Sequence, residues 1–136
     1  MNLQARIDLL TDVLKTYNVD TRTWEVQRDL PKFKFRGVTP GADHDVIDAM
    51  LLRAPLPHVI LIEGADGEYF ECIGGQAVLD TAMDVMNNLD IYEPFHLVRR
   101  IKETKLDVVI FRCNMKREDI AFLANKFYGI TITEEE

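Results

Sequence analysis

The sequence predicts an α+β domain in which a small mixed sheet, containing a β-hairpin, is flanked by about four helices. The uninterrupted apolar run over residues 59–62 predicts a strand that is buried on both faces, and the strongly apolar segment 106–113 predicts another strand. The turn at residues 65–67 joins the first run to the apolar segment 69–73, which predicts the hairpin and excludes a purely parallel sheet. Several other segments repeat apolar residues at the period of an α-helix.

The composition is that of an ordinary globular domain, with 47% apolar and 29% charged residues. A chain of 136 residues is expected to form one domain, residues 1–136, with its own core. No apolar run approaches the ~18 residues of a transmembrane helix, and the first residues do not resemble a signal peptide. We therefore expect a cytoplasmic protein without a membrane partner.

The first helix is expected over residues 3–17, where five apolar or aromatic side chains fall on one face: Leu3, Ile7, Leu10, Leu14 and Tyr17. A strand over residues 22–28 follows, since its β-branched and aromatic residues favour extended structure. Residues 29–42 carry proline or glycine at four positions and form the only long loop that the sequence predicts.

Three further helices are expected downstream. The first begins after Asp43, which is a good N-cap, and ends before a proline. The second covers residues 76–89, where apolar side chains again follow the helical period. The last is capped by Asn114 and ended by Gly129. Residues 91–105 give no clear period.

Basic residues gather in two clusters although the formal charge of the chain is −7. The first cluster is Lys32, Lys34 and Arg36, and the second is Arg99, Arg100, Lys102 and Lys105. These clusters are either ordinary solvated faces or contacts for nucleic-acid phosphates. The acidic net charge opposes the second interpretation, because binding to a nucleic-acid backbone relies on basic residues that displace counterions.

The sequence offers few residues for covalent or metal chemistry. It contains no serine, and Cys72 and Cys113 each lie in an apolar run, so both are expected to be buried, unpaired thiols. His44 lies among aspartates, which either cap a helix or hold a cation, and the capped helix needs no ligand. We therefore expect no metal centre.

A glycine pair, Gly74-Gly75, joins the predicted strand 69–73 to the predicted helix 76–89. Backbone N–H groups at the start of a helix bind anions, and glycine lets a phosphate approach closely. The same pair also suits a tight strand-to-helix turn that binds nothing. The glycines alone leave both interpretations open.

Three motifs follow one another along the chain: Gln27-Arg28 near the first strand, Gly74-Gly75-Gln76-Ala77-Val78-Leu79 at a helix start, and Phe122-Leu123-Ala124-Asn125 near the end. With the hairpin and helices between them, they resemble the ParB-like domain that begins GmrSD-type restriction enzymes, within the ParB/sulfiredoxin-like superfamily. The resemblance covers residues 22–136 and leaves residues 1–21 as an N-terminal helix. It implies a ParB-like α+β fold.

The family's Asp-Gly-Gln-Gln-Arg-Leu motif implies binding and hydrolysis of a nucleoside triphosphate with magnesium. This chain keeps Gly75, Gln76 and Leu79, but it has Gly74 in place of the acid and Val78 in place of the arginine. An acid orients water or metal, and an arginine neutralises phosphate charge in the transition state. Their loss implies a degenerate motif, no catalytic residues and no required cofactor.

Some residues of the resembling nucleotide site remain in this chain. Arg28 is either a phosphate contact or the partner of Asp29 or Glu25 in a surface ion pair. If nucleotide binding persists, Asp80 or Glu71 is expected to replace the missing acid. The pocket would then consist of Gln27, Arg28, Gly74, Gly75, Gln76 and Asp80.

Three functions are compatible with these observations. The leading hypothesis is a non-catalytic ParB-like domain that binds a protein partner or its own copies, as a phage or mobile-element regulator or inhibitor of a defence system. It predicts an exposed apolar patch. The first alternative is a nucleoside triphosphate hydrolase of the ParB-like family. The second alternative is a DNA-binding accessory protein that uses the two basic clusters, which the net charge makes the weakest of the three.

Overall fold

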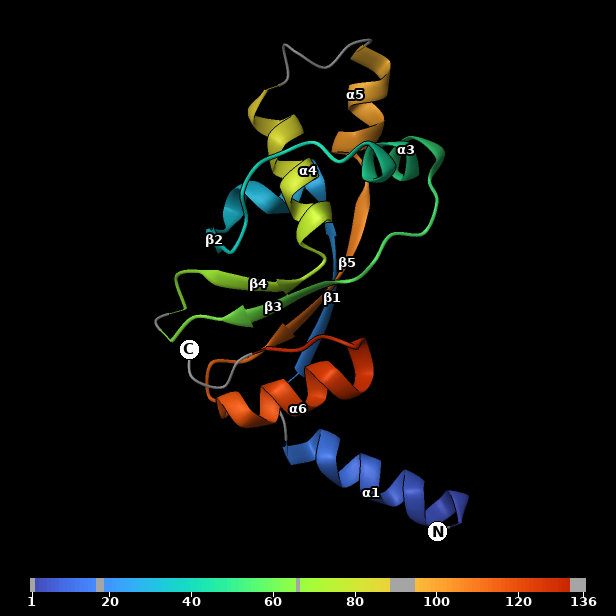
Figure 1. Ribbon diagram of the computed structural model, residues 1–136, viewed down its shortest axis with the longest axis vertical. Coiled ribbons are helices and arrows are strands. Elements are labelled where there is room, and N and C mark those ends of the chain that lie inside the picture. The colour runs from blue at the N-terminus through green and yellow to red at the C-terminus, as the bar shows by residue number, and fades with distance from the viewer. Residues whose placement is uncertain (1, 17–18, 66, 89–94, 133–136) are drawn as a thin grey trace.

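Figure 1 shows the computed structural model, which describes residues 2–16, 19–65, 67–88 and 95–132. Five strands form one sheet: β1 (Val19–Glu25), β2 (Phe35–Arg36), β3 (Val59–Glu63), β4 (Phe70–Gly74) and β5 (Lys105–Phe111). The helices are α1 (Leu3–Thr16), α2 (Val26–Asp29), α3 (His44–Leu52), α4 (Gln76–Asn87), α5 (Phe95–Lys102) and α6 (Arg117–Tyr128), with a 3₁₀ turn η1 (Leu30–Lys32). The predicted α+β class is confirmed.

The sheet is mixed, with the strand order β1-β5-β3-β4-β2. Its neighbours β5 and β3 are parallel, so that Val108 lies beside Val59 and Phe111 beside Ile62. Strand β1 is antiparallel to β5, and β4 returns from β3 as the predicted hairpin. Because β3 and β5 point the same way, their carboxyl ends meet at one edge of the sheet, which is where parallel sheets commonly place polar sites.

Helices cover both faces of the sheet, with α3, α4 and α5 on one side and α6 on the other (Figure 1). The larger core lies on the first side and includes Val26, Leu30, Met50, Leu61, Leu79, Val85 and Val108. The smaller core lies under α6 and consists of Ile60, Ile62, Val109, Phe111, Ile120, Leu123 and Ala124. Successive residues of β3 and β5 therefore enter opposite cores, which explains why these strands are apolar at consecutive positions.

Four aromatic rings hold the segment before α3 against the sheet. Trp24 stacks on Phe33 with ring centroids 4.7 Å apart. Phe70 lies 5.8 Å from Trp24 and 5.4 Å from Phe33, and Phe35 completes the cluster. The predicted long loop at 29–42 is therefore only partly irregular, because it contains η1 and the short strand β2, which pairs with β4.

The predicted strand over residues 22–28 is wrong at its second half. Strand β1 begins earlier, at Val19, and ends at Glu25, and the chain then turns into α2. Val26 is fully buried, and its N–H donates to the carbonyl of Thr104. The carboxylate of Asp29 accepts a hydrogen bond from the N–H of Glu25, which satisfies a backbone donor at the helix start.

The remaining helices largely follow the sequence. Asp43 caps α3 as predicted, accepting hydrogen bonds from the N–H groups of Asp45 and Val46 at 2.9 and 3.2 Å. Gly129 ends α6 in the left-handed conformation with φ 65°, also as predicted. The predicted cap at Asn114 is wrong, because α6 begins two residues later than expected. Its N-cap is Lys116, since residues 112–115 form a turn closed by the Met115 N–H and the Arg112 carbonyl.

Helix α1 extends away from the rest of the molecule, as the blue helix in Figure 1 shows. Its bounds agree with the predicted helix at 3–17, of which residue 17 lies outside the described part of the chain. Helix α5 lies within residues 91–105, where the hydrophobic residues show no clear period, and residues 91–94 of that stretch are outside the described residues. Among the described helices, none has both the length and the apolar character needed to cross a membrane.

Candidate functional site

The residues predicted for a nucleotide pocket lie on separate elements. Gln27 and Arg28 belong to α2, residues 74–76 join β4 to α4, and Asp80 lies further along α4. In the described part of the chain, no hydrogen bond or ion pair connects Gln27 or Arg28 with residues 74–76 or with Asp80. Each of these groups has partners of its own, which are described in turn below.

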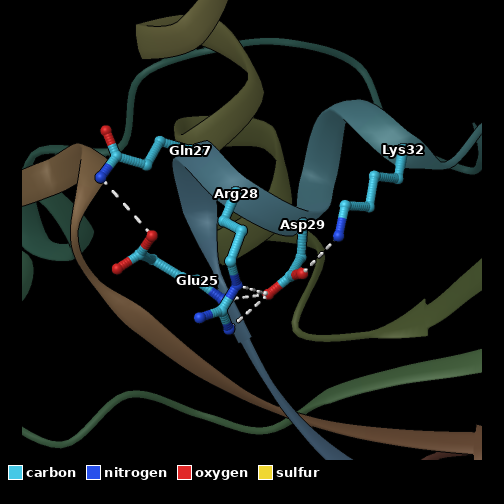
Figure 2. Close-up of polar contacts among 5 residues, drawn as sticks. All are labelled: Glu25, Gln27, Arg28, Asp29 and Lys32. Carbon is cyan, nitrogen blue, oxygen red and sulfur yellow. Dashed lines mark hydrogen bonds and ion pairs between the residues drawn. The ribbon is translucent and has the colours of Figure 1, made fainter.

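Arg28 is paired with its neighbour in sequence, Asp29 (Figure 2). Its Nη2 and Nε atoms lie 2.9 and 3.1 Å from Oδ2 of Asp29, and Nζ of Lys32 lies 3.5 Å from Oδ1. These contacts place two cations and one backbone donor around a single carboxylate. The hydrogen bond from Arg28, followed by that from the Glu25 N–H, lowers the pKa of Asp29 to about 2.

Arg28 thus forms the ion pair with Asp29 that the sequence offered as one of its two interpretations. The same contact raises the pKa of Arg28, so its charge is permanent. Gln27 lies on the same short helix and its Nε2 is 3.5 Å from Oε2 of Glu25 (Figure 2). Because the Arg28 side chain is still 56% exposed, the pair is a surface contact of small energetic weight.

The space beside the α-carbons of Gly74 and Gly75 is occupied by other atoms of the protein. A Cβ atom added to Gly74 would lie 2.3 Å from Cδ1 of Ile130 and 2.9 Å from Cγ1 of Ile60. One added to Gly75 would lie 2.5 Å from the carbonyl oxygen of His58, which is backbone and cannot rotate away. Gly75 also has a positive φ of 69°. Packing and backbone conformation therefore account for both glycines without a phosphate.

Asp80 accepts two hydrogen bonds from the loop that precedes α3. Its carboxylate Oδ1 accepts a hydrogen bond from the N–H of Thr39 at 3.0 Å, and its carbonyl accepts one from the N–H of Gly41 at 3.1 Å. The neighbouring hydroxyl of buried Thr81 accepts a hydrogen bond from the N–H of Asp43. This pair of residues thus attaches the loop to α4. Gln76, the first residue of α4, is exposed.

Val78, at the arginine position of the motif, and Glu71, a candidate for the missing acid, also have partners elsewhere in the protein. Val78, which stands where the family has arginine, is 1% exposed and belongs to the larger core, as its place on the apolar stripe predicts. Glu71, one candidate for the missing acid, lies with Oε2 3.2 Å from Nη1 of Arg117 at the start of α6. Its carboxylate is therefore directed to the face of the sheet opposite the α4 core.

A polar cluster that the sequence analysis missed lies at the carboxyl ends of β3 and β5. Arg112 forms ion pairs with both Asp20 and Glu63, the latter at 2.8 Å. Glu63 also accepts hydrogen bonds from Cys113, which lower the pKa of its carboxyl together with the contact to Arg112. Cavities of about 550 and 220 Å³ adjoin the cluster. The feature that could have revealed this cluster is the parallel pairing of β3 and β5, which brings the ends of the two apolar runs together.

Cys113 is exposed, which corrects the expectation that both cysteines are buried; Cys72 is buried as expected. The reason is that β5 ends at Phe111, so Cys113 lies in the turn beyond the sheet. The hydrogen bond to Glu63 raises the pKa of the Cys113 thiol, and burial raises that of Cys72 to about 11. Since the nucleophile is the thiolate, neither cysteine is activated at neutral pH.

The basic clusters and His44 provide no assembled site. Lys32 contacts Asp29, the guanidinium of Arg36 lies 3.7 Å from the centre of the Tyr69 ring, and Arg100 donates to the carbonyl of Leu51 at 2.9 Å. In the described ranges, no three of the histidine, cysteine, aspartate and glutamate side chains are grouped to hold a metal ion. The aspartate before His44 acts as a helix cap.

Exposed apolar side chains gather on α1 and α6. On α1, Leu3, Ile7 and Leu9 are exposed, and on α6 Phe122 and Phe127 are both more than half exposed. The two helices lie at the same end of the molecule, below the sheet in Figure 1. We call these five residues the α1–α6 surface; by the helical period Leu9 lies on the opposite side of α1 from Leu3 and Ile7, and Phe122 is the one that lies opposite the buried side of α6. Large exposed apolar side chains on neighbouring elements are typical of interaction sites.

Comparison with models of protein families gave no match, and neither curated proteins nor solved structures gave a significant one. The resemblance to the ParB-like domain of GmrSD-type enzymes accordingly stays a prediction from the motifs. The structure shows a mixed α+β fold with a β-hairpin.

Proposed function

We propose that this chain is a non-catalytic ParB-like domain that acts by binding protein. The observation that carries the proposal is the α1–α6 surface, where α1 presents three large aliphatic side chains to solvent and α6 presents two phenylalanines. Burying such side chains against a partner is favourable by about 25 cal/mol for each Å² of apolar surface. In this proposal the domain is carried by a phage or mobile element and regulates or inhibits a defence system.

The contacts of the residues predicted for nucleotide binding support the non-catalytic part of the proposal. Arg28 is paired with Asp29, Asp80 holds the Thr39 N–H, and a Cβ at Gly75 would overlap backbone. Phosphoryl transfer relies on positioned cations and metal ligands around the phosphates. Here the cation and the acid are committed to intramolecular partners on different elements, so they do not surround a common space.

Nucleotide titration tests this proposal directly. Calorimetry with ATP, GTP, CTP and UTP, each with and without magnesium, is expected to give no binding heat at millimolar nucleotide, and phosphate release is expected to stay at the background rate. The physical reason is that Arg28 and Asp80, the cation and the acid of the predicted pocket, are held by Asp29 and by the Thr39 N–H on separate elements. Saturable binding with turnover would overturn the non-catalytic assignment and favour the hydrolase.

An arginine variant serves as the internal check on that titration. If a binding heat does appear, Arg28→Ala must weaken it for the predicted pocket to be its source, whereas Arg22→Ala, which removes an exposed arginine of β1 paired with Asp20, must leave it unchanged. Equal effects of the two substitutions would assign the heat to non-specific attraction between charges.

A further inference from the structure

We propose that the open edge of β1 binds an extended basic segment of a partner protein, which adds a strand to the sheet and places an arginine or lysine beside Asp107. This inference rests on the proposed function, because the ligand is again a protein. It uses residues outside the α1–α6 surface, so it can fail while that surface still binds. Addition of a strand to an exposed sheet edge is a recurrent way in which proteins bind peptides.

Strand β1 is one of the two edges of the sheet, and it is the longer of the two. It has seven residues against two in β2, contains no proline, and keeps one register with β5 from Val19 to Glu25. Prolines, bulges and short length are common features that prevent an edge strand from pairing with another chain. The β1 edge has none of these features, whereas β2 is protected by its length.

The register of β1 determines which backbone groups lie at this edge. The Val26 N–H donates to the Thr104 carbonyl, which extends the β1–β5 register by one residue. Residues that face β5 alternate with residues that face away, so the backbone groups of Thr21, Thr23 and Glu25 are directed to the open edge. The Glu25 N–H is bound by a carboxylate of α2. The N–H and carbonyl groups of the two threonines therefore remain for an added strand.

A cavity of about 300 Å³ lies beside the middle of β1. Thr21 lies opposite Val109 of the smaller core and Thr23 lies opposite Asp107, so both threonines share the face of the sheet that α6 covers. His58, the residue before β3, lies at the level of Asp107 in the parallel β3–β5 register and also borders the cavity. Polar side chains thus form a row across three strands, from Thr23 through Asp107 to His58.

The Asp107 carboxylate gives this cavity a preference for a cation. In the part of the chain that the structure describes, Asp107 is exposed and has no hydrogen bond or ion pair. Arg22 also borders the cavity, but by the alternation of a strand its side chain belongs to the opposite face, where its Nε lies 2.9 Å from Oδ2 of Asp20. The formal charge of −7 likewise favours a basic partner.

The distance across β1 selects a long side chain on the added strand. That strand would lie about 10 Å from β5, which is twice the spacing of neighbouring strands. Its residue opposite Thr23 shares a face with Asp107, and only a long side chain at that place reaches across β1 to the carboxylate. Arginine and lysine combine this length with a positive charge. The Tyr128 ring, which is 36% exposed, borders the same cavity and offers a surface to the aliphatic stem.

Titration of designed peptides into the full chain tests this inference. The probe is a capped peptide of about nine threonine and valine residues with one central arginine, and a matched peptide carries glutamate at the centre. NMR of the ¹⁵N-labelled protein is expected to show the largest shift changes at the amides of Thr21 and Thr23. The arginine peptide is expected to bind about tenfold or more tightly than the glutamate peptide. A peptide with N-methylated backbone amides is expected not to bind, because it cannot form the strand ladder.

Two substitutions separate the backbone edge from the cation site. Thr21→Pro removes an outward N–H and leaves the ladder to β5 intact, so it is expected to abolish binding of the arginine peptide. Asp107→Asn is expected to weaken the arginine peptide about fivefold or more and to reduce its advantage over the glutamate peptide. The control Asp48→Asn removes an exposed carboxylate of α3 and should change neither affinity. Circular dichroism checks that each variant retains the fold.

The contrary results are equally specific. Shift changes away from β1, or none at millimolar peptide, would overturn the inference. Equal affinities for the two peptides, or an Asp107→Asn chain that binds as the wild type does, would refute the basic partner. A wild-type dimer in sedimentation equilibrium that Thr21→Pro dissociates would assign the edge to a second copy and so overturn the inference as well. None of these results concerns the α1–α6 surface or the nucleotide titration, so the proposed function is tested separately.

Discussion

Replacing Gly75 with alanine is expected to lower the free energy of unfolding by roughly 3 kcal/mol or more. Two costs add at this position. The backbone has φ 69°, where a side chain is strained, and the new Cβ would lie 2.5 Å from the His58 carbonyl oxygen and 3.0 Å from Cα of Val59. Both contacts are with backbone at the start of β3, so relief would require the sheet to move. Chemical denaturation measures the loss.

Gly129→Ala is the matched control for that substitution. Gly129 has nearly the same φ, 65°, but nothing lies within 4 Å of an added Cβ, so only the backbone strain of about 1 kcal/mol is expected. The difference between the two variants isolates the steric term. If Gly75→Ala were as stable as Gly129→Ala and instead abolished a nucleotide-binding heat, the glycine would serve a phosphate rather than the packing described here.

Phe111→Ala is expected to cost about 3–5 kcal/mol, since it removes a large side chain from a packed core. The Phe111 ring is 1% exposed and lies between the end of β5 and α6, with its centroid 6.5 Å from that of Tyr128 in an edge-on arrangement. The cavity would open beneath α6, where the smaller core has only seven buried members. Thermal and denaturant unfolding at low protein concentration measure the effect.

The same substitution at Phe122 provides the comparison. Phe122 lies on the outer face of α6 and is 56% exposed, so Phe122→Ala should change the unfolding free energy by no more than about 0.5 kcal/mol in the monomer. A large loss at Phe122 together with a small one at Phe111 would mean that the two faces of α6 have been assigned the wrong way round.

The elements with a clear hydrophobic period were predictable from the sequence. The apolar runs of β3 and β5 are strands because their consecutive residues enter two cores, and the sheet is parallel at that point because α4 and α5 lie between them in the chain. The Asp43 cap was predictable because an aspartate side chain satisfies orphan N–H groups locally. These signals depend on residues that are close in sequence.

Features that depend on distant residues were not predictable in the same way. The turn into α2 depends on the Val26 N–H, which donates to the carbonyl of Thr104. Strand propensity, which ignores such contacts, predicted a strand for the same segment. The start of α6 at Arg117 likewise follows from where β5 ends, not from the capping ability of Asn114. Local preference was outweighed in both places by contacts that only the folded chain provides.

The candidate site shows the same division. The prediction that Gln27, Arg28 and the glycines share one pocket relied on the order of the motifs along the chain. That order does not predict which neighbouring group each side chain contacts in the folded protein. Arg28 donates to the carboxylate of Asp29, one residue away, and the carboxylate of Asp80 accepts a hydrogen bond from a backbone N–H that is 41 residues away. The apolar stripe of α1 was visible in the sequence, but the exposure of Leu3 and Ile7 was not, because a stripe at the helical period normally predicts a buried face.

Amide hydrogen exchange of α1 in the dilute protein is the most direct test of the claim that this helix is an interaction element. A 14-residue helix without a partner exchanges at close to the rates of an unfolded peptide. The account predicts that α1 amides exchange at these rates while the amides of α6, which packs on the sheet, are protected. Protection of the α1 amides comparable to that of α6 would show that α1 packs on its own chain, and would contradict it.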